Sequence, residues 1–196
     1  MRLSRVNSLL LIAIIAINTY VIAAPILPAA SYWLQNRSGQ KRQALEAKLQ
    51  PVSSTAQPDS PNSLVAPAML LDQPILEGVK SDMYRVLDKG IWRWPDSSTP
   101  DRGGNTVLLG HRFTYTNPQG ALYYLDKLRV GDSIGMVWNG KTYVYTVQQV
   151  KTVRPDDTSI LAPTDLPTLT IYTCTPLWLP RDRLVVTAIL QEGAIR

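Results

Sequence analysis

The chain has 196 residues, and 45% of them are hydrophobic, including five Trp and nine Tyr, which excludes a disordered protein. The formal net charge of +5 belongs to the amino-terminal part, because residues 1–67 carry six Lys and Arg against two acidic residues, whereas residues 68–196 carry fourteen against thirteen. Nucleic-acid binding needs basic side chains gathered on one surface. A domain with nearly balanced charge is therefore not expected to bind nucleic acid.

An uncharged segment lies between Arg5 and Arg37, and within it residues Leu9–Ala24 are almost entirely apolar. A helix needs about 20 mostly apolar residues to span a membrane. The segment therefore predicts a transmembrane signal anchor. Pro25 and Pro28 are expected to kink or end the helix near one face of the membrane, because proline removes a helix hydrogen bond.

The orientation of this anchor follows from Arg2 and Arg5, which lie on its short side. Basic residues favour the cytoplasmic side, so the prediction is a single-pass protein with a cytoplasmic amino terminus and all later residues outside. The alternative is a cleaved signal peptide, because Ala23 and Ala24 are small. Pro25 would follow that cut directly, which disfavours cleavage, and both interpretations export the domain.

Three regions are expected along the chain. Residues 1–36 form the cytoplasmic tip and the transmembrane anchor. Residues 37–67 comprise a short polar helix, Gly39–Leu49, and a Pro/Ser-rich spacer from Pro51, whose composition cannot bury a core. Residues 68–196 form the exported domain.

Short apolar runs separated by turn residues begin at about residue 68, a pattern typical of β-strands. Asn139-Gly140 favours a type I′ hairpin between two of these strands. Only Gly120–Leu128 is expected to be helical, with its leucines facing inward. Many short strands and few helices predict an all-β fold with a closed barrel, which leaves no exposed sheet edge. The expected strands are residues 68–71, 74–78, 106–110, 133–138, 141–150, 168–173 and 184–190.

The chemistry-bearing residues stand at strand ends. Cys174 follows the strand 169–173, His111 ends the run 105–110, and Arg183 opens the last strand. An exported single cysteine cannot form an internal disulfide, and a thiol nucleophile needs a base or a cationic neighbour. Taken singly, each residue has a plainer interpretation: a buried core cysteine, a structural histidine, a solvated arginine.

Two sequence motifs favour a functional role for these three residues over the plainer interpretations. The segment Thr168–Pro176, with an arginine nine positions after the cysteine, resembles the signature of the sortases, which are bacterial cysteine transpeptidases. Upstream, Gly104–Arg112 is similar to the family's histidine segment, and Leu125–Asp132 is similar to the stretch that follows it. The similarity runs from about Pro74 to Leu190. Residues 110–115 and 174–186 look most similar to class E sortases, rather than to the class C pilin polymerases.

This resemblance implies a sortase-like β-barrel and a role for each site residue. Cys174 would be the nucleophile, His111 the general acid and base, and Arg183 the residue that positions substrate and stabilises the oxyanion. Thr173 matches the threonine before the family's cysteine and is a candidate substrate contact. Arg181 competes for the arginine role, but the spacing favours Arg183. No cofactor and no metal are expected.

The function implied is that of a transpeptidase in the bacterial cell membrane. It would cleave a Leu-Pro-X-Thr-Gly-like or Leu-Ala-X-Thr-Gly-like sorting signal of a secreted protein between Thr and Gly. The acyl group would pass through a thioester on Cys174 to an amine of a peptidoglycan precursor or of a pilin-type lysine. The alternatives are a cysteine endopeptidase that releases the acyl group to water, and a non-catalytic anchored binding or scaffold domain.

Overall fold

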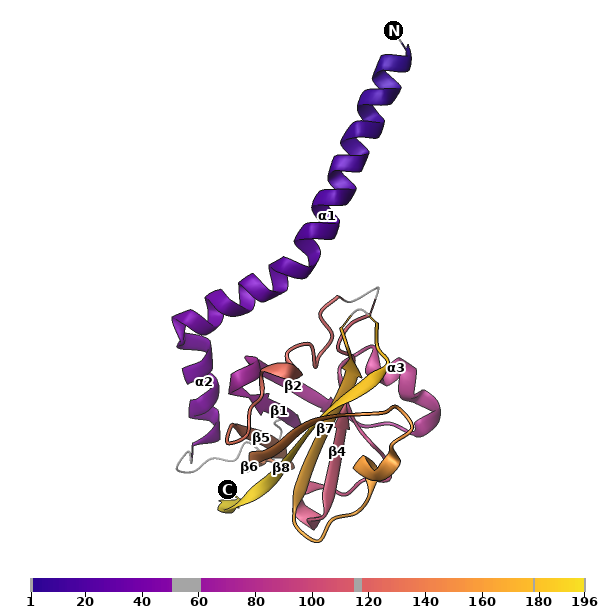
Figure 1. Ribbon diagram of the computed structural model, residues 1–196. Helices are drawn as coiled ribbons and strands as arrows, with labels where there is room; N and C mark the ends of the chain where they lie inside the picture. Colours follow the sequence, from indigo (N-terminus) through magenta and orange to yellow (C-terminus); the bar gives the residue numbers. More distant parts are fainter. Residues whose placement is uncertain (1, 51–60, 115–117, 178, 196) are drawn as a thin grey trace. The chain divides into compact units, whose positions relative to one another are not determined.

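The computed structural model describes residues 2–50, 61–114, 118–177 and 179–195, and the chain divides into two compact units, residues 1–40 and 41–196. The first unit is the helix α1 (Arg2–Ser38). Its segment Val6–Ala23 has a mean hydropathy of 2.1, so α1 is long and apolar enough to cross a membrane by length and composition. The helix continues past Pro25 and Pro28, and it bends part-way along its length (Figure 1).

The second unit is a closed barrel of eight strands in the order β1-β2-β3-β4-β7-β8-β6-β5, which confirms the predicted fold class (Figure 1). Pairing of β1 with β5 closes the barrel. Most neighbours are antiparallel, whereas β2 with β3 and β4 with β7 are parallel. The strands are β1 (Ser63–Ala66), β2 (Leu71–Leu76), β3 (Ile91–Arg93), β4 (Asn105–Leu109), β5 (Ser133–Trp138), β6 (Lys141–Val153), β7 (Thr168–Thr175) and β8 (Asp182–Ile195).

The predicted hairpin joins β5 to β6. Asn139 and Gly140 both have positive φ angles, 49° and 75°, as a type I′ turn requires. In β6 the side chains of Tyr143, Tyr145 and Val147 are buried in alternation with more exposed ones. The two-residue period in the sequence of β6 therefore corresponds to side chains that point alternately to the inside and the outside of the barrel wall.

The barrel begins earlier than residue 68, the expected start, because β1 starts at Ser63. Its residues Leu64, Val65 and Ala66 are buried, but the run is too short to stand out beside the Pro/Ser-rich composition before it. The polar helix is present as α2 (Gln40–Leu49). Residues 51–60 of the expected spacer lie outside the described residues.

The predicted helix over Gly120–Leu128 is wrong. The chain forms turns followed by a single 3₁₀ turn at Leu125–Lys127. Leu122, Leu125 and Leu128 are nonetheless fully buried. Their spacing of three residues matches the 3₁₀ period, in which side chains at i and i+3 align, better than the α-helical period of 3.6.

Two apolar clusters cover the two faces of the barrel wall. The inner cluster fills the barrel and includes Leu108, Leu169, Ile171 and Val186. An outer cluster lies against the wall, where α3 (Met83–Leu87) packs beside β3, β4 and β7 (Figure 1). Its members are Val86, Trp92 and Leu109, with Leu76, Met83, Leu87, Trp94 and Tyr172 packed against them.

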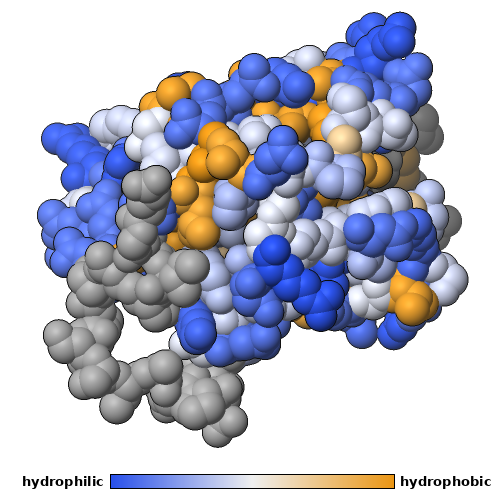
Figure 2. Space-filling model, turned by 90° about the horizontal axis from the view of Figure 1, so that it is seen from below, coloured by the Kyte–Doolittle hydropathy of each residue, from blue (hydrophilic) through white to orange (hydrophobic). Residues whose placement is uncertain are grey.

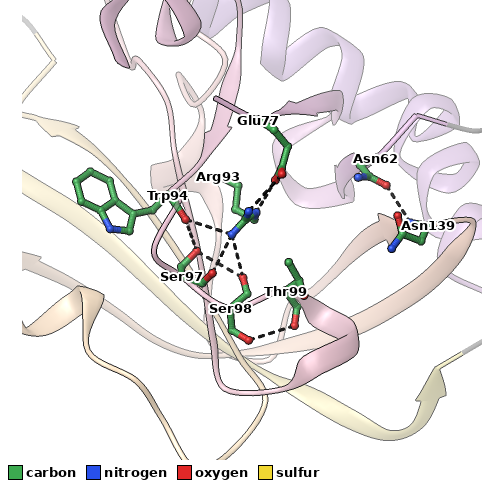
Figure 3. A network of polar contacts seen from close by, with 8 residues as sticks. All are labelled: Asn62, Glu77, Arg93, Trp94, Ser97, Ser98, Thr99 and Asn139. Carbon is green, nitrogen blue, oxygen red and sulfur yellow. Dashed lines mark hydrogen bonds and ion pairs between the residues drawn. The ribbon is translucent and has the colours of Figure 1, made fainter. Parts of the chain in front are cut away.

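Arg93 at the end of β3 ties together the loops on one side of the barrel (Figure 3). Its guanidinium pairs with Glu77, and Nη1 donates to the carbonyl oxygens of Trp94 and Ser97, at 3.2 and 2.8 Å. The Arg93 side chain is only 11% exposed. Buried charge needs such partners, so this arginine holds the chain that connects β3 to β4.

The barrel surface is mixed in polarity. On the face that Figure 2 shows, hydrophobic residues form small separate groups among hydrophilic ones. Scattered apolar side chains are normal on a protein surface and do not by themselves mark a binding site. The polarity of this face therefore does not mark a functional site, and the chemistry of individual side chains is the better indication.

Candidate active site

Cys174 lies near the end of β7 on the outer face of the barrel wall. Along β7, Leu169 and Ile171 belong to the inner cluster, whereas Tyr172 packs on the outer one. Because successive side chains of a strand point to opposite faces, Cys174 shares the outer face with Tyr172. The cysteine is a free thiol of intermediate exposure. A nucleophile in this position is held by a rigid strand.

Arg183 is the direct cross-strand partner of Cys174 in the antiparallel ladder between β7 and β8. Residues directly opposite in such a ladder have Cα atoms about 4.5–5.5 Å apart and side chains on the same face. Arg181 lies before β8 and is exposed, and its backbone N–H donates to the carbonyl of Thr175 at 3.0 Å. The geometry thus favours Arg183 over Arg181 as the cysteine's cationic neighbour.

His111 reaches the same edge from β4. The parallel register pairs Leu109 with Tyr172, and one residue further the hydroxyl of Thr173 donates to the carbonyl of Gly110 at 2.7 Å. His111 follows Gly110 directly, so it comes beside Cys174. The order of strands β4, β7 and β8 places the cysteine between the histidine and the arginine, with adjacent strands about 4.8 Å apart.

Thr173 is 2% exposed. Its hydroxyl bond to Gly110 links the two strand ends that carry the histidine and the cysteine. The structure therefore gives Thr173 a structural role on the inner face, and its predicted contact with substrate stays a prediction.

The backbone of His111 is held by the chain that returns after it. Leu122 N–H donates to the carbonyl of His111 at 3.0 Å, and Gly120 N–H donates to the carbonyl of Arg112 at 3.1 Å. A Cβ added at Gly120 would lie 2.2 Å from the carbonyl oxygen of His111. Only glycine permits this approach.

Arg112 points away from the site, as alternation predicts for the neighbour of His111. Its guanidinium pairs with Asp126 at 3.1 Å and donates to the hydroxyl of Thr175 at 3.1 Å. It also donates from Nε to the carbonyl of Tyr123 at 3.3 Å. Arg112 therefore anchors the loop after the histidine and does not compete with Arg183.

Tyr172 and Asp88 are two neighbours of the site that the sequence did not identify. Burial raises the pKa of Tyr172 to about 12, with the charge of Arg183 opposing the rise and that of Cys174 adding to it. The phenol thus lies within electrostatic range of both residues. Asp88 follows α3, and its Oδ1 lies 3.5 Å from Nε2 of His111. Asp88 stands in no recognisable sequence pattern, and Tyr172 lies within the segment Thr168–Pro176 but has no role assigned to it there.

Within the described ranges, no group of three or more His, Cys, Asp and Glu side chains could hold a metal ion. The site offers a thiol, an imidazole and a guanidinium on one face. These groups can supply a nucleophile, a proton carrier and a cation for a tetrahedral oxyanion.

The sequence model of the family described as Sortase domain matches residues 64–191, which are most of the barrel. The chain belongs to the sortase family. It is 33% identical to Sortase D of Bacillus subtilis (strain 168) over 127 residues, which cover 65% of this chain and 60% of that protein. The match therefore spans less than two thirds of that curated relative.

Solved sortase structures share the fold. A Sortase D5 transpeptidase of Clostridium perfringens is 27% identical with a TM-score of 0.58, and the match covers 76% of this chain and 88% of that one. Clostridium perfringens sortase C, solved with the C-terminal cell wall sorting motif, is 27% identical with a TM-score of 0.57. That match covers 66% of this sortase and 69% of the other chain. The resemblance to class E stays a prediction.

Proposed function

We propose that this sortase is a membrane-anchored cysteine transpeptidase that cleaves a Leu-Pro-X-Thr-Gly-like or Leu-Ala-X-Thr-Gly-like signal between Thr and Gly. The observation that carries the proposal is the cross-strand pairing of Cys174 with Arg183, with His111 following the neighbouring strand on the other side. Membership of the family and the likeness to a sortase described as a transpeptidase support it.

In the first half-reaction the thiolate of Cys174 attacks the carbonyl carbon of the substrate threonine, and a C–S bond forms. The carbonyl oxygen becomes an oxyanion, which the guanidinium of Arg183 stabilises. The C–N bond to glycine then breaks as the imidazolium of His111 protonates the departing amine. The products are a thioester on Cys174, a free amino-terminal glycine and a neutral imidazole.

In the second half-reaction an acceptor amine attacks the thioester carbonyl and gives up a proton to the neutral imidazole of His111. A new C–N bond forms, the C–S bond breaks, and the thiolate returns. The acceptor is an amine of a peptidoglycan precursor or of a pilin-type lysine. The donors are secreted proteins with C-terminal sorting signals.

The proposed location is the bacterial cell membrane, with the amino terminus in the cytoplasm and the barrel outside. Its support is the length and hydropathy of α1 together with the basic residues Arg2 and Arg5 before the apolar segment. Reporter fusions at each end of α1 test this topology. An external amino terminus would contradict it.

The deciding experiment is intact-protein mass spectrometry of the full chain incubated with a library of Leu-Pro-X-Thr-Gly and Leu-Ala-X-Thr-Gly peptides. A mass increase equal to the acyl fragment is expected on Cys174, and it should be absent in Cys174→Ala. Removal of the adduct by an added amine, with formation of the amide product, indicates a transpeptidase. Products of hydrolysis alone, whatever amine is added, indicate an endopeptidase.

A binding or scaffold domain is distinguished by alkylation of the native protein. The transpeptidase proposal expects a thiol reagent to label Cys174 in the folded chain, and a sorting-peptide analogue to block that labelling. Absence of the thioester, together with labelling only after denaturation, would overturn the enzymatic proposal in favour of the scaffold.

A further inference from the structure

Asp88 and Cys174 lie on opposite sides of the His111 ring. Oδ1 of Asp88 is 3.5 Å from Nε2 of His111. A pocket of about 280 Å³ beside the ring is lined by Asp88 and His111, whereas among the described residues Cys174 and Arg183 do not line it. In the same ranges of the chain, Asp88 pairs with no other cation, and no protein group hydrogen-bonds to Nδ1 of His111. One nitrogen of the imidazole is therefore next to a carboxylate, and the other is left to the reaction.

The backbone that carries Asp88 is held in place. Its N–H donates to the carbonyl of Tyr84 at 3.1 Å, which continues the last turn of α3. Two residues later, the carbonyl oxygen of Gly90 lies 3.6 Å from the place that a Cβ of Gly110 would occupy. The segment with the carboxylate thus packs against the residue that precedes His111. This contact between the two segments brings the carboxylate to the imidazole.

We propose that Asp88 is a positioning residue, which holds a proton on Nε2 of His111 and so makes Nδ1 the nitrogen that exchanges protons with the substrate. The inference rests on the proposed function and deepens it. An ionised carboxylate can only accept a hydrogen bond, so Asp88 favours the form of the ring with N–H at Nε2. The two ring nitrogens point in diverging directions, and Nδ1 is therefore turned away from Asp88, toward the groups that react at Cys174.

The proton balance of the two half-reactions agrees with this assignment. The imidazolium carries a proton on each nitrogen, and the departing amine takes the one on Nδ1. The ring is then neutral, with its remaining proton on Nε2 facing Asp88. The acceptor amine attacks the thioester and gives a proton to Nδ1, which restores the imidazolium. The proton on Nε2 stays throughout, so one nitrogen of His111 serves as acid and as base.

The kinetic test replaces one carboxylate oxygen by an amide. In Asp88→Asn the new NH₂ group can donate to Nε2, which favours the opposite form of the ring, with N–H at Nδ1. For the full chain with a Leu-Pro-X-Thr-Gly peptide, we expect kcat for thioester formation to fall about tenfold and KM to stay within about twofold. This loss lies between that of an exposed ion pair and that of a buried triad carboxylate, because the Asp88 side chain is 69% exposed and that of His111 only 27%.

Two further variants complete the comparison. Asp88→Glu keeps a carboxylate and should recover most of kcat. Asp82→Asn is the matched control, because it removes the same charge from the start of α3, where Asp82 pairs with Arg85 and does not line the pocket. Its kcat and KM should equal those of the unmodified chain.

The proton on the ring can be located directly, because His111 is the only histidine of the chain. Two-bond ¹H–¹⁵N correlation of the full chain, labelled with [¹⁵N]histidine in detergent micelles at pH 9, reads which nitrogen of the neutral imidazole carries it. We expect Nε2 in the unmodified chain and in Asp88→Glu, and a shift of population toward Nδ1 in Asp88→Asn. A merely structural effect of the substitution would not move the proton from one nitrogen to the other.

The failures of the two proposals can be told apart. An unmodified chain with its proton on Nδ1 would overturn the role of Asp88, and so would an Asp88→Asn variant with unchanged kcat or an unchanged proton distribution. Each of these results leaves the proposed function standing as long as the thioester forms. Absence of a thioester on Cys174 in the unmodified chain would overturn the proposed function itself, and with it the catalytic use of Nδ1.

Discussion

Gly120 approaches the backbone of His111 so closely that an added Cβ would lie 2.2 Å from the His111 carbonyl oxygen. The obstacle is backbone, which cannot rotate away as a flexible side chain can. A substituent at this position must therefore move the segment that carries the histidine. The site depends on a glycine that lies outside every catalytic motif.

Gly120→Ala is accordingly expected to lower the rate of thioester formation by about 100-fold, because a displacement of about 1 Å in a catalytic group has an effect of that size. Quenched-flow measurement of the Cys174 adduct checks this rate. Gly131→Ala is the control, since Gly131 has a φ of +91°, which strains an alanine, but has nothing within 4 Å of an added Cβ. Comparable loss in both variants would point to general strain.

Arg183→Met should reduce kcat/KM for peptide cleavage by about 100- to 1000-fold, the usual effect of removing a group that stabilises an oxyanion. Arg181→Met should change kcat/KM by less than about twofold, because Arg181 precedes β8 and is exposed. A continuous fluorogenic assay compares the two. A larger loss for Arg181→Met would reverse the assignment of the arginine.

Thr173→Val removes the hydroxyl bond to Gly110 while keeping the side-chain shape. We expect a loss of about 1–2 kcal/mol in the free energy of unfolding and about a tenfold slower acylation, because the two strand ends lose their link. Thr170→Val is the control, because Thr170 donates to Oδ1 of Asn105 at 2.8 Å further from the site. It should lose similar stability and keep its activity, and slowed acylation in this variant would contradict the assignment.

Arg93→Met is expected to destabilise the barrel by about 2–3 kcal/mol, because the carbonyls of Trp94 and Ser97 lose a buried charged donor. Arg85→Met should cost less than about 0.5 kcal/mol, since the Arg85 side chain is 64% exposed and its ion pair with Asp82 is on the surface. Urea unfolding followed by tryptophan fluorescence measures both. Equal effects would show that the Arg93 network contributes little.

Tyr172 makes stability fall at high pH. Its pKa is raised to about 12 in the folded chain, against about 10 in the unfolded one, so folding keeps the phenol protonated. The stabilisation from this group is complete below about pH 10 and is lost as the pH rises to about 12. Wild type should therefore lose more stability than Tyr172→Phe between pH 9 and pH 11 in urea unfolding. A pH-independent difference between the two would refute this linkage.

The hairpin and the long strands could be predicted from the sequence because their signals are local. Asn139-Gly140 dictates its own turn, and β6 alternates over many residues. β3 could not be predicted, since its three residues are held by pairing with β2 and β4 rather than by a pattern of their own. The closed barrel could still be predicted, because the other strands are many and short and the expected helices are few.

The candidate site was predictable in part for the same reason. Cys174, His111 and Arg183 stand in motifs at strand ends, where register decides their neighbours. Asp88 and Gly120 reach His111 through contacts between segments distant in sequence, and such contacts have no spacing rule. The hydroxyl bond of Thr173 to Gly110 is of the same kind. The predicted contact of Thr173 with substrate comes instead from its match to the family's threonine before the cysteine.

The alternation along β7 assigns the packing of the barrel interior to one set of residues and the chemistry of the candidate site to another. Leu169 and Ile171 fill the interior, while Tyr172 and Cys174 belong to the exterior face. Exterior positions such as Cys174 can therefore be altered without repacking the inner cluster. A wall of this kind lets specificity diverge among descendants of one barrel while its folding remains unchanged.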